Sequence, residues 1–130
     1  MTTTHSAILV CYSLLSFVAM GCTPTAPTPE AEAKAIVKAA LDSWNLGGSS
    51  SEFPESQKNV ERFFDIDWVG MKVLLRYEIK GVTKDTSGLG GFKVIAVLVF
   101  QSKGGTEITE QRTYKVYPAL TEGKWEVSSS

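Results

Sequence analysis

Three side chains at alternate positions of one segment combine a carboxylate, a guanidinium and a phenol. Glu110, Arg112 and Tyr114 follow Ile108 in the sequence EITEQRTY, and residues two apart share one face of a strand. Together with Tyr77 they could line a pocket that binds a small molecule and exchanges a proton with it. The alternative, which we favour, is the solvent side of an edge strand, on which Glu110 and Arg112 form a plain ion pair.

The segment Asp65–Gly70 (DIDWVG) begins like a calcium-binding loop. The pattern then fails, because the fifth position is Val69 and the twelfth, which a bidentate Glu should occupy, is Arg76. We therefore expect no metal at this segment. We expect instead that Asp67 caps or turns the chain before Trp68 packs.

The residue types that most enzymes use as nucleophiles and bases are nearly absent. The only histidine is His5 and the only cysteines are Cys11 and Cys22. If the leader is removed and Cys22 is modified, as argued below, most nucleophile–base pairs and a zinc site are excluded, and we expect no cofactor. Thirteen Lys+Arg against fourteen Asp+Glu give a net charge of −1, so we expect no nucleic-acid partner, which would require a basic surface.

The first 29 residues carry no Asp, Glu, Lys or Arg, and the first such residue is Glu30. Within them, Ala7–Met20 is a run of 14 largely apolar residues. Its length matches the roughly 7–15 apolar residues of a secretory signal and falls short of the ~20 that cross a bilayer as a helix. The run ends in Ala19-Met20-Gly21-Cys22, which resembles the lipobox of bacterial lipoproteins. That resemblance implies cleavage between Gly21 and Cys22, acylation of Cys22, and export to a bacterial membrane, with the outer membrane as one destination.

Two features depart from the lipobox pattern. Ala19 stands where Leu is usual, and Met1–Ser6 lacks Lys and Arg, so an ordinary signal peptide with a chance Cys, or an uncleaved anchor, is the alternative. The segment TPTAPTP after Cys22 has the composition of a semi-extended tether and favours the lipoprotein. We divide the chain into a signal peptide 1–21, a lipidated Cys and tether 22–29, one domain 30–127, and a tail 128–130.

One helix is well specified by its apolar residues, which recur with a period of 3.6; they are Ala33, Ile36, Val37, Ala40, Leu41 and Trp44. Thr28 can cap its start with Pro29 in the first turn, and Gly47-Gly48 can end it. Like Trp68 and Trp125, Trp44 could be a wall on which a ligand stacks, but we favour core packing.

The second half of the chain changes to a period of two, which predicts strands. Met71–Ile79 has apolar side chains at its odd positions and is predicted to bury them. Phe92–Gln101 is apolar on both faces in its middle, so it is predicted to be a central strand covered on both sides. Ser102–Gly105 is a hairpin turn that leads to a strand over Glu107–Tyr117, and Lys124–Val127 is a short last strand.

These elements predict an α+β fold with one long N-terminal helix packed on a curved antiparallel sheet of three to four strands, an α+β roll. Ser49–Val69 carries too many large apolar residues for a free loop. We expect it to pack, with a helical turn between Pro54 and Phe64. Either this segment or a second copy of the chain then covers the second face of the Phe92–Gln101 strand.

The motifs between roughly Pro29 and Val127 occur in a recognisable order. They are Asp42-Ser43-Trp44, a Gly/Ser break, Asp67-Trp68-x-Gly70, Leu74-x-x-Tyr77 and Tyr114-x-Val116. This order resembles small bacterial envelope proteins with a cystatin-like or nuclear-transport-factor-two-like cone domain. The resemblance implies a fold more than an activity, because that superfamily includes dehydratases and isomerases with Asp, Tyr or His in the cone as well as members without known chemistry.

The first functional hypothesis is a membrane-anchored bacterial lipoprotein whose domain is a non-catalytic binding or protein-interaction module. The tether and the missing catalytic residue types favour it. The alternative is a small-molecule isomerase or dehydratase that uses cone-lining Asp or Glu and Tyr; a passive envelope spacer ranks third. The expected partners are the membrane, through the lipid, and a second copy of the chain, through the sheet face.

Mass spectrometry of the chain recovered from a bacterial host tests the anchor. We expect an N-terminus at Cys22 that carries acyl chains, because the thiol of a lipobox Cys is the acylated group. Cys22→Ala should leave the protein without acyl chains. Recovery of the wild-type chain with its leader attached, or with a free thiol at Cys22, would contradict the lipoprotein interpretation.

Overall fold

The computed structural model describes residues 27–88 and 90–130. The signal peptide, the cleavage site at Gly21 and Cys22, and the first part of the tether lie outside the described residues. Among the described residues the elements in chain order are α2 (Pro29–Asn45), α3 (Phe53–Ser56), β1 (Val60–Phe64), α4 (Ile66–Val69), β2 (Val73–Lys84), β3 (Phe92–Gln101), β4 (Glu107–Pro118) and β5 (Trp125–Ser129). One long helix packs against one sheet, which confirms the predicted α+β class.

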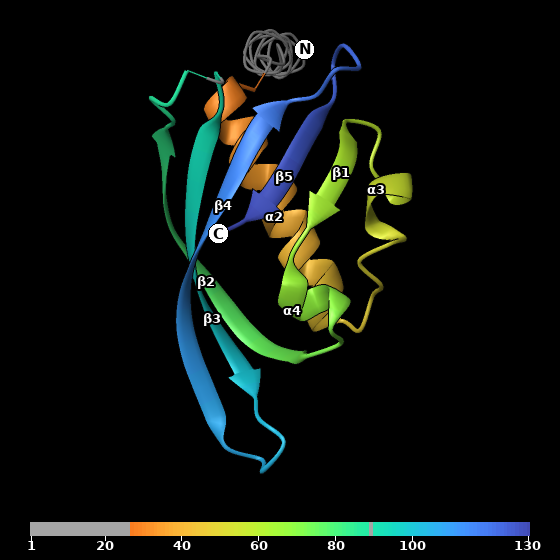
Figure 1. Ribbon diagram of the computed structural model, residues 1–130, viewed down its shortest axis with the longest axis vertical. Helices are drawn as coiled ribbons and strands as arrows, with labels where there is room; N and C mark the ends of the chain where they lie inside the picture. The colour runs from red at the N-terminus through yellow and green to blue at the C-terminus, as the bar shows by residue number, and fades with distance from the viewer. Residues whose placement is uncertain (1–26, 89) are drawn as a thin grey trace, which may run out of the picture.

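The sheet has five strands in the order β1-β5-β4-β3-β2. β1 runs parallel to β5, whereas the other neighbouring strands are antiparallel. The prediction of an antiparallel sheet of three to four strands was therefore wrong. Figure 1 shows this sheet curling around α2, while the β3–β4 hairpin continues past the end of the helix.

The missed strand is β1, and its irregularity explains the error. A register shift between Val60 and Arg62 separates the two buried side chains, Val60 and Phe63, by three positions. That spacing does not alternate, so a period of two cannot reveal the strand. The helical turn expected between Pro54 and Phe64 is present as α3, which begins one residue earlier at Phe53.

Helix α2 forms where its apolar spacing and its capping residues predict it. The Thr28 side chain accepts a hydrogen bond from the Ala31 N–H (3.1 Å), and all six residues of the apolar stripe are buried. The helix ends at Asn45, and Gly47 follows with a φ of 87°, which a residue with a side chain seldom adopts.

Strand β2 begins at Val73, and the prediction that its odd positions are buried throughout was wrong. Met71 and Val73 are exposed while Leu74 is buried. A register shift between Leu74 and Arg76 reverses the alternation. Beyond this bulge the odd residues Tyr77 and Ile79 are the ones that pack against the core.

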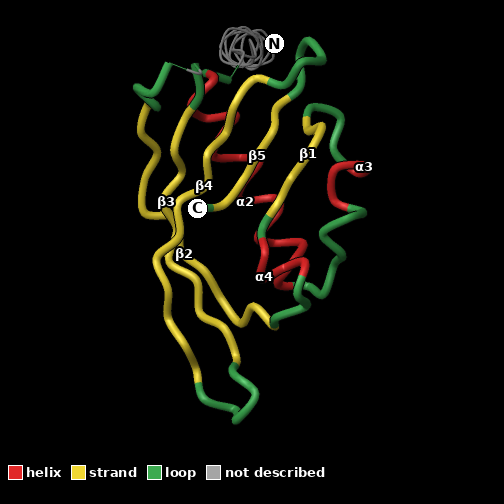
Figure 2. The backbone as a smooth tube through the Cα atoms, in the orientation of Figure 1, coloured by secondary structure: helices red, strands yellow, loops and turns green. Residues whose placement is uncertain are grey.

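The core lies between α2 and one face of the sheet, and the segment 49–69 packs into this same core. Phe53, Phe63 and Trp68 join the cluster that contains the buried residues of α2, and Figure 2 shows α3 and α4 beside β1. The idea that this segment covers the second face of β3 was therefore wrong. On that face Ile95 and Val97 are half-buried, and a second copy of the chain placed there stays a prediction.

Candidate functional site

The most buried polar group of the domain is a carboxylate that holds the sheet to the chain between β1 and α4. Asp65 is fully buried. Arg112 donates from Nη1 to both carboxylate oxygens of Asp65 (2.8 and 3.0 Å), and the Tyr114 hydroxyl donates to Oδ2 (2.6 Å). Asp65 also accepts the Asp67 N–H (2.9 Å) and so caps α4.

The second nitrogen of the same guanidinium binds two more carboxylates. Arg112 Nη2 donates to Asp67 and to Glu110 (2.6 Å), and Lys72 pairs with Asp67 (3.1 Å). We call Asp65, Asp67, Lys72, Glu110, Arg112 and Tyr114 the Arg112 cluster. Two cations face three carboxylates in it, and each of these carboxylates is bonded to Arg112.

Two members of the Arg112 cluster, Asp67 and Tyr114, have shifted pKa values. Burial alone would raise the pKa of Asp67, but hydrogen bonds from Lys72 and Arg112 outweigh it and hold that pKa below its ordinary value. Burial and the neighbouring charge of Asp65 raise the pKa of Tyr114 far above its ordinary value. Asp67 therefore stays ionised and Tyr114 stays protonated, which suits a structural clamp.

The structure brings three of the four predicted pocket residues together. Glu110, Arg112 and Tyr114 lie on the face of β4 that packs toward the core, and Arg112 is only 8% exposed. The favoured interpretation of a solvent-exposed ion pair was therefore wrong for Arg112, although Glu110 keeps a partly exposed side chain. Tyr77 lies elsewhere and donates its hydroxyl to Asp42 of α2.

The aspartates that complete the cluster were not recognised as partners of Arg112. Asp65, and not Asp67, caps the short helix before Trp68. The available signal was the DID sequence directly after Phe63-Phe64, because an Asx residue often opens a helix. Among residues 27–88 and 90–130, no group of three or more His, Cys, Asp or Glu side chains is placed to hold a metal ion.

A cavity of about 540 Å³ opens at the end of α2, away from the Thr28 cap. It lies between that end, the loop that follows it, and the turn that joins α4 to β2. Its lining residues are Trp44, Asn45, Gly47, Gly48, Ser49, Ser50, Ser51, Trp68, Val69, Met71, Lys72, Val73 and Leu74. Lys72 is the only charged residue among these lining residues. It is also the only lining residue that belongs to the Arg112 cluster.

Two stacked tryptophans give the cavity a rigid apolar wall. The rings of Trp44 and Trp68 lie 5.7 Å apart at an interplanar angle of 11°. Trp44 Nε1 donates to the Lys72 carbonyl (2.8 Å) and Trp68 Nε1 to the Gly48 carbonyl (2.7 Å). Since both indole N–H groups are satisfied by backbone, the rings need no polar partner from a ligand.

The sequence left open whether each tryptophan packs in the core or lines a ligand site, and two of the three do both. Trp44 and Trp68 are buried in the core, as favoured, and they also line the cavity. Trp125 is half-buried, packs near Phe92, and donates to Glu32 (3.0 Å). It is not among the lining residues.

Comparison with known proteins finds no matching family model, no matching curated protein and no matching solved structure. Within the part of the chain that the structure describes, no helix is long and apolar enough to span a membrane. The site is therefore interpreted from its own geometry.

Arg112→Met tests whether the Arg112 cluster holds the fold. Met keeps an unbranched apolar side chain but leaves the buried Asp65 without a cation, so the free energy of unfolding should fall by roughly 3–5 kcal/mol in urea denaturation. The matched control is Arg76→Met, which breaks an exposed pair with Glu107 (2.8 Å) and should have a much smaller effect. Equal losses in the two variants would contradict the clamp.

Asp67→Asn tests the lowered pKa of Asp67. Because the folded-state pKa lies below the ordinary value of 3.8, ionised Asp67 contributes stability that is complete above that value and is lost as the pH falls through the folded-state pKa. Wild type should therefore exceed Asp67→Asn in stability at pH 7, and the difference should shrink on acidification below pH 3.8. Urea denaturation at several pH values measures it, and a constant difference would contradict the assignment.

Proposed function

We propose that this chain is an exported, lipid-anchored bacterial protein whose domain is a non-catalytic binding module. The cavity beside Trp44 and Trp68 is its ligand site, and the ligand is a small, uncharged, largely apolar molecule. The observation that carries this proposal is an open, largely apolar cavity without a carboxylate among its lining residues, beside an ionisable cluster whose three carboxylates are all bonded to Arg112.

The size and lining of the cavity support a small ligand. Ligand pockets typically enclose ~300–1,000 Å³ and combine apolar walls with few polar groups, and this cavity holds about 540 Å³. The serines of the loop 49–51 provide hydroxyls, and no carboxylate lines the cavity. An uncharged molecule therefore meets no unpaired charge at the walls and needs few hydrogen-bond partners.

The apolar residues that line the cavity offer less exposed surface than a protein interface buries. Three lining residues, Val69, Met71 and Val73, are at least half exposed. At about 100 Å² for each side chain they offer roughly 300 Å², whereas a specific protein interface buries ~800 Å² per partner. A small ligand would instead lie inside the cavity, against lining residues of α2, α4 and β2.

The Arg112 cluster supports binding over the alternative isomerase or dehydratase. An enzyme of that kind needs a carboxyl of raised pKa that faces an open pocket. Asp67 has a lowered pKa, and Glu110 is bonded to Arg112. Neither carboxylate lines the cavity, so the groups that would transfer protons lie apart from the space that would hold a substrate.

The place of the cavity agrees with a lipid anchor at Cys22. The tether enters α2 at Pro29, and the cavity lies at the other end of this 17-residue helix, about 25 Å away at 1.5 Å per residue. A membrane at the tether would leave the cavity facing the compartment, where it can receive a diffusing ligand. The helix held in a curved sheet also supports the cystatin-like resemblance, from which the parallel strand β1 departs.

Fluorescence of N-phenyl-1-naphthylamine, an uncharged apolar probe, tests the ligand site on residues 27–130, whose core closes among its own residues. We expect saturable enhancement of probe emission together with quenching of tryptophan emission, since two of the three tryptophans line the cavity. Val73→Arg places a charge at the cavity wall and should abolish binding.

The matched control is Leu120→Arg, because Leu120 is a fully exposed apolar residue that does not line the cavity. It should bind the probe like wild type. Absence of saturable binding in wild type, or equal binding by Val73→Arg and wild type, would overturn the proposed ligand site.

A further inference from the structure

Met71 is the one residue with a side chain that has a positive φ among residues 27–88 and 90–130, with a φ of 61°. It occupies the turn that ends α4. The Met71 N–H donates to the Trp68 carbonyl (3.0 Å) and the Lys72 N–H to the Asp67 carbonyl (3.0 Å). These paired bonds form a Schellman motif, in which Met71 holds the left-handed position.

Glycine is the residue that this position favours. A side chain at positive φ brings its Cβ close to the backbone, and glycine avoids that cost. The chain has a glycine one residue earlier, at Gly70, where φ is −74°, a value that residues with side chains also adopt. Met71 therefore carries backbone strain that a glycine at the same position would relieve.

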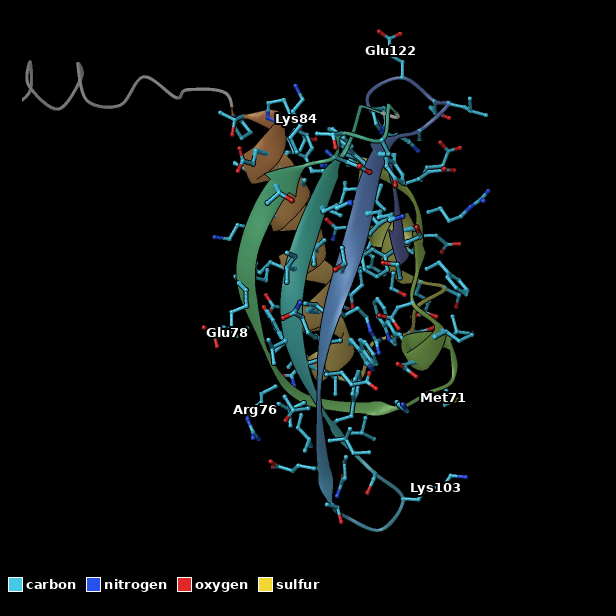
Figure 3. All side chains as sticks on the ribbon, turned by 60° about the vertical axis from the view of Figure 1, so that its left-hand side comes forward. Met71, Arg76, Glu78, Lys84, Lys103 and Glu122 are labelled. Atoms are coloured by element: carbon cyan, nitrogen blue, oxygen red, sulfur yellow. The ribbon has the colours of Figure 1, made fainter. Side chains whose placement is uncertain are left out.

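Packing within the domain does not explain why a methionine stands there. Its side chain is 87% exposed, and it is not part of the buried core or of the residues packed against it. Figure 3 shows Met71 where the chain enters β2, at the other end of this strand from Lys84. This exposed, flexible apolar side chain stands at the mouth of the cavity that Trp44 and Trp68 wall.

We infer that Met71 is the ligand-covering residue of the cavity: its side chain folds over a bound apolar molecule and buries it against the tryptophan wall. The inference rests on the proposed function and adds to it the residue that retains the ligand. An unbranched thioether suits this role, because its rotatable bonds let it adapt to the shape of an apolar ligand. Strained backbone conformations are found more often at functional sites than elsewhere in proteins.

The backbone geometry gives this inference a test that separates stability from binding. Met71→Gly should raise the melting temperature of residues 27–130 by about 4 °C, since the left-handed position is relieved of its side chain. The same variant should bind N-phenyl-1-naphthylamine roughly tenfold more weakly, because the apolar cover is lost. A gain in stability with a loss of affinity is not expected from a residue that only supports the fold.

Two further variants separate the side chain from the backbone. Met71→Leu keeps an apolar side chain at the same strained position, so it should keep the melting temperature of wild type and bind the probe more tightly than Met71→Gly. Met71→Asn tolerates the left-handed conformation but lacks an apolar side chain, so its affinity should fall as that of Met71→Gly does.

The outcomes distinguish this inference from the proposed function. If wild type binds the probe and Met71→Gly or Met71→Asn binds it equally well, the cavity is a ligand site but Met71 does not cover it, and the inference fails alone. If wild type shows no saturable binding, the proposed function fails and the inference fails with it.

Discussion

The ion pair between Arg112 and Asp65 joins the middle of the sheet to the junction of β1 and α4. A single carboxylate there serves two elements, because it binds the guanidinium of β4 and also caps α4 through the Asp67 N–H. Removing a charged pair from water is costly, and only several good hydrogen bonds offset that cost. Here the guanidinium reaches three carboxylates and Tyr114 adds a bond to the most buried of them.

The cavity depends on this ion pair indirectly, through the position of α4. Asp65 fixes the start of α4, and α4 in turn places Trp68 against Trp44. The turn that leaves α4 then carries Met71 and the first residues of β2, which complete the wall. The polar cluster thus determines the shape of the neighbouring cavity, and the two form one structural unit.

The parts of the fold that follow local rules were predictable. Helix α2 has a continuous apolar stripe between a capping threonine and a glycine, and the β3–β4 hairpin has a short glycine turn between two long strands. The register of β2 was not predictable, because a bulge near Leu75 exchanges its two faces. Strand β1 was not predictable for a related reason. Its two buried side chains are three residues apart, and its partner strand lies far along the sequence.

The candidate site shows the same division. The spacing of Glu110, Arg112 and Tyr114 correctly put them on one face of a strand, but both faces of β4 carry polar residues, so composition does not say which one is buried. The partner that decides it, Asp65, is 47 residues away in the sequence from Arg112. The cavity has no sequence motif at all, because three separate elements contribute its walls and each contribution follows ordinary rules of packing.

The parallel pairing of β1 with β5 has a consequence for how the chain reaches its folded state. Residues 60–64 acquire their sheet neighbour only when residues 125–129 are available, so β1 waits while the hairpins between them assemble locally. The sheet therefore cannot close while only its early segments are available. Closure of this kind leaves β1 without a neighbouring strand until the last strand of the sheet is in place.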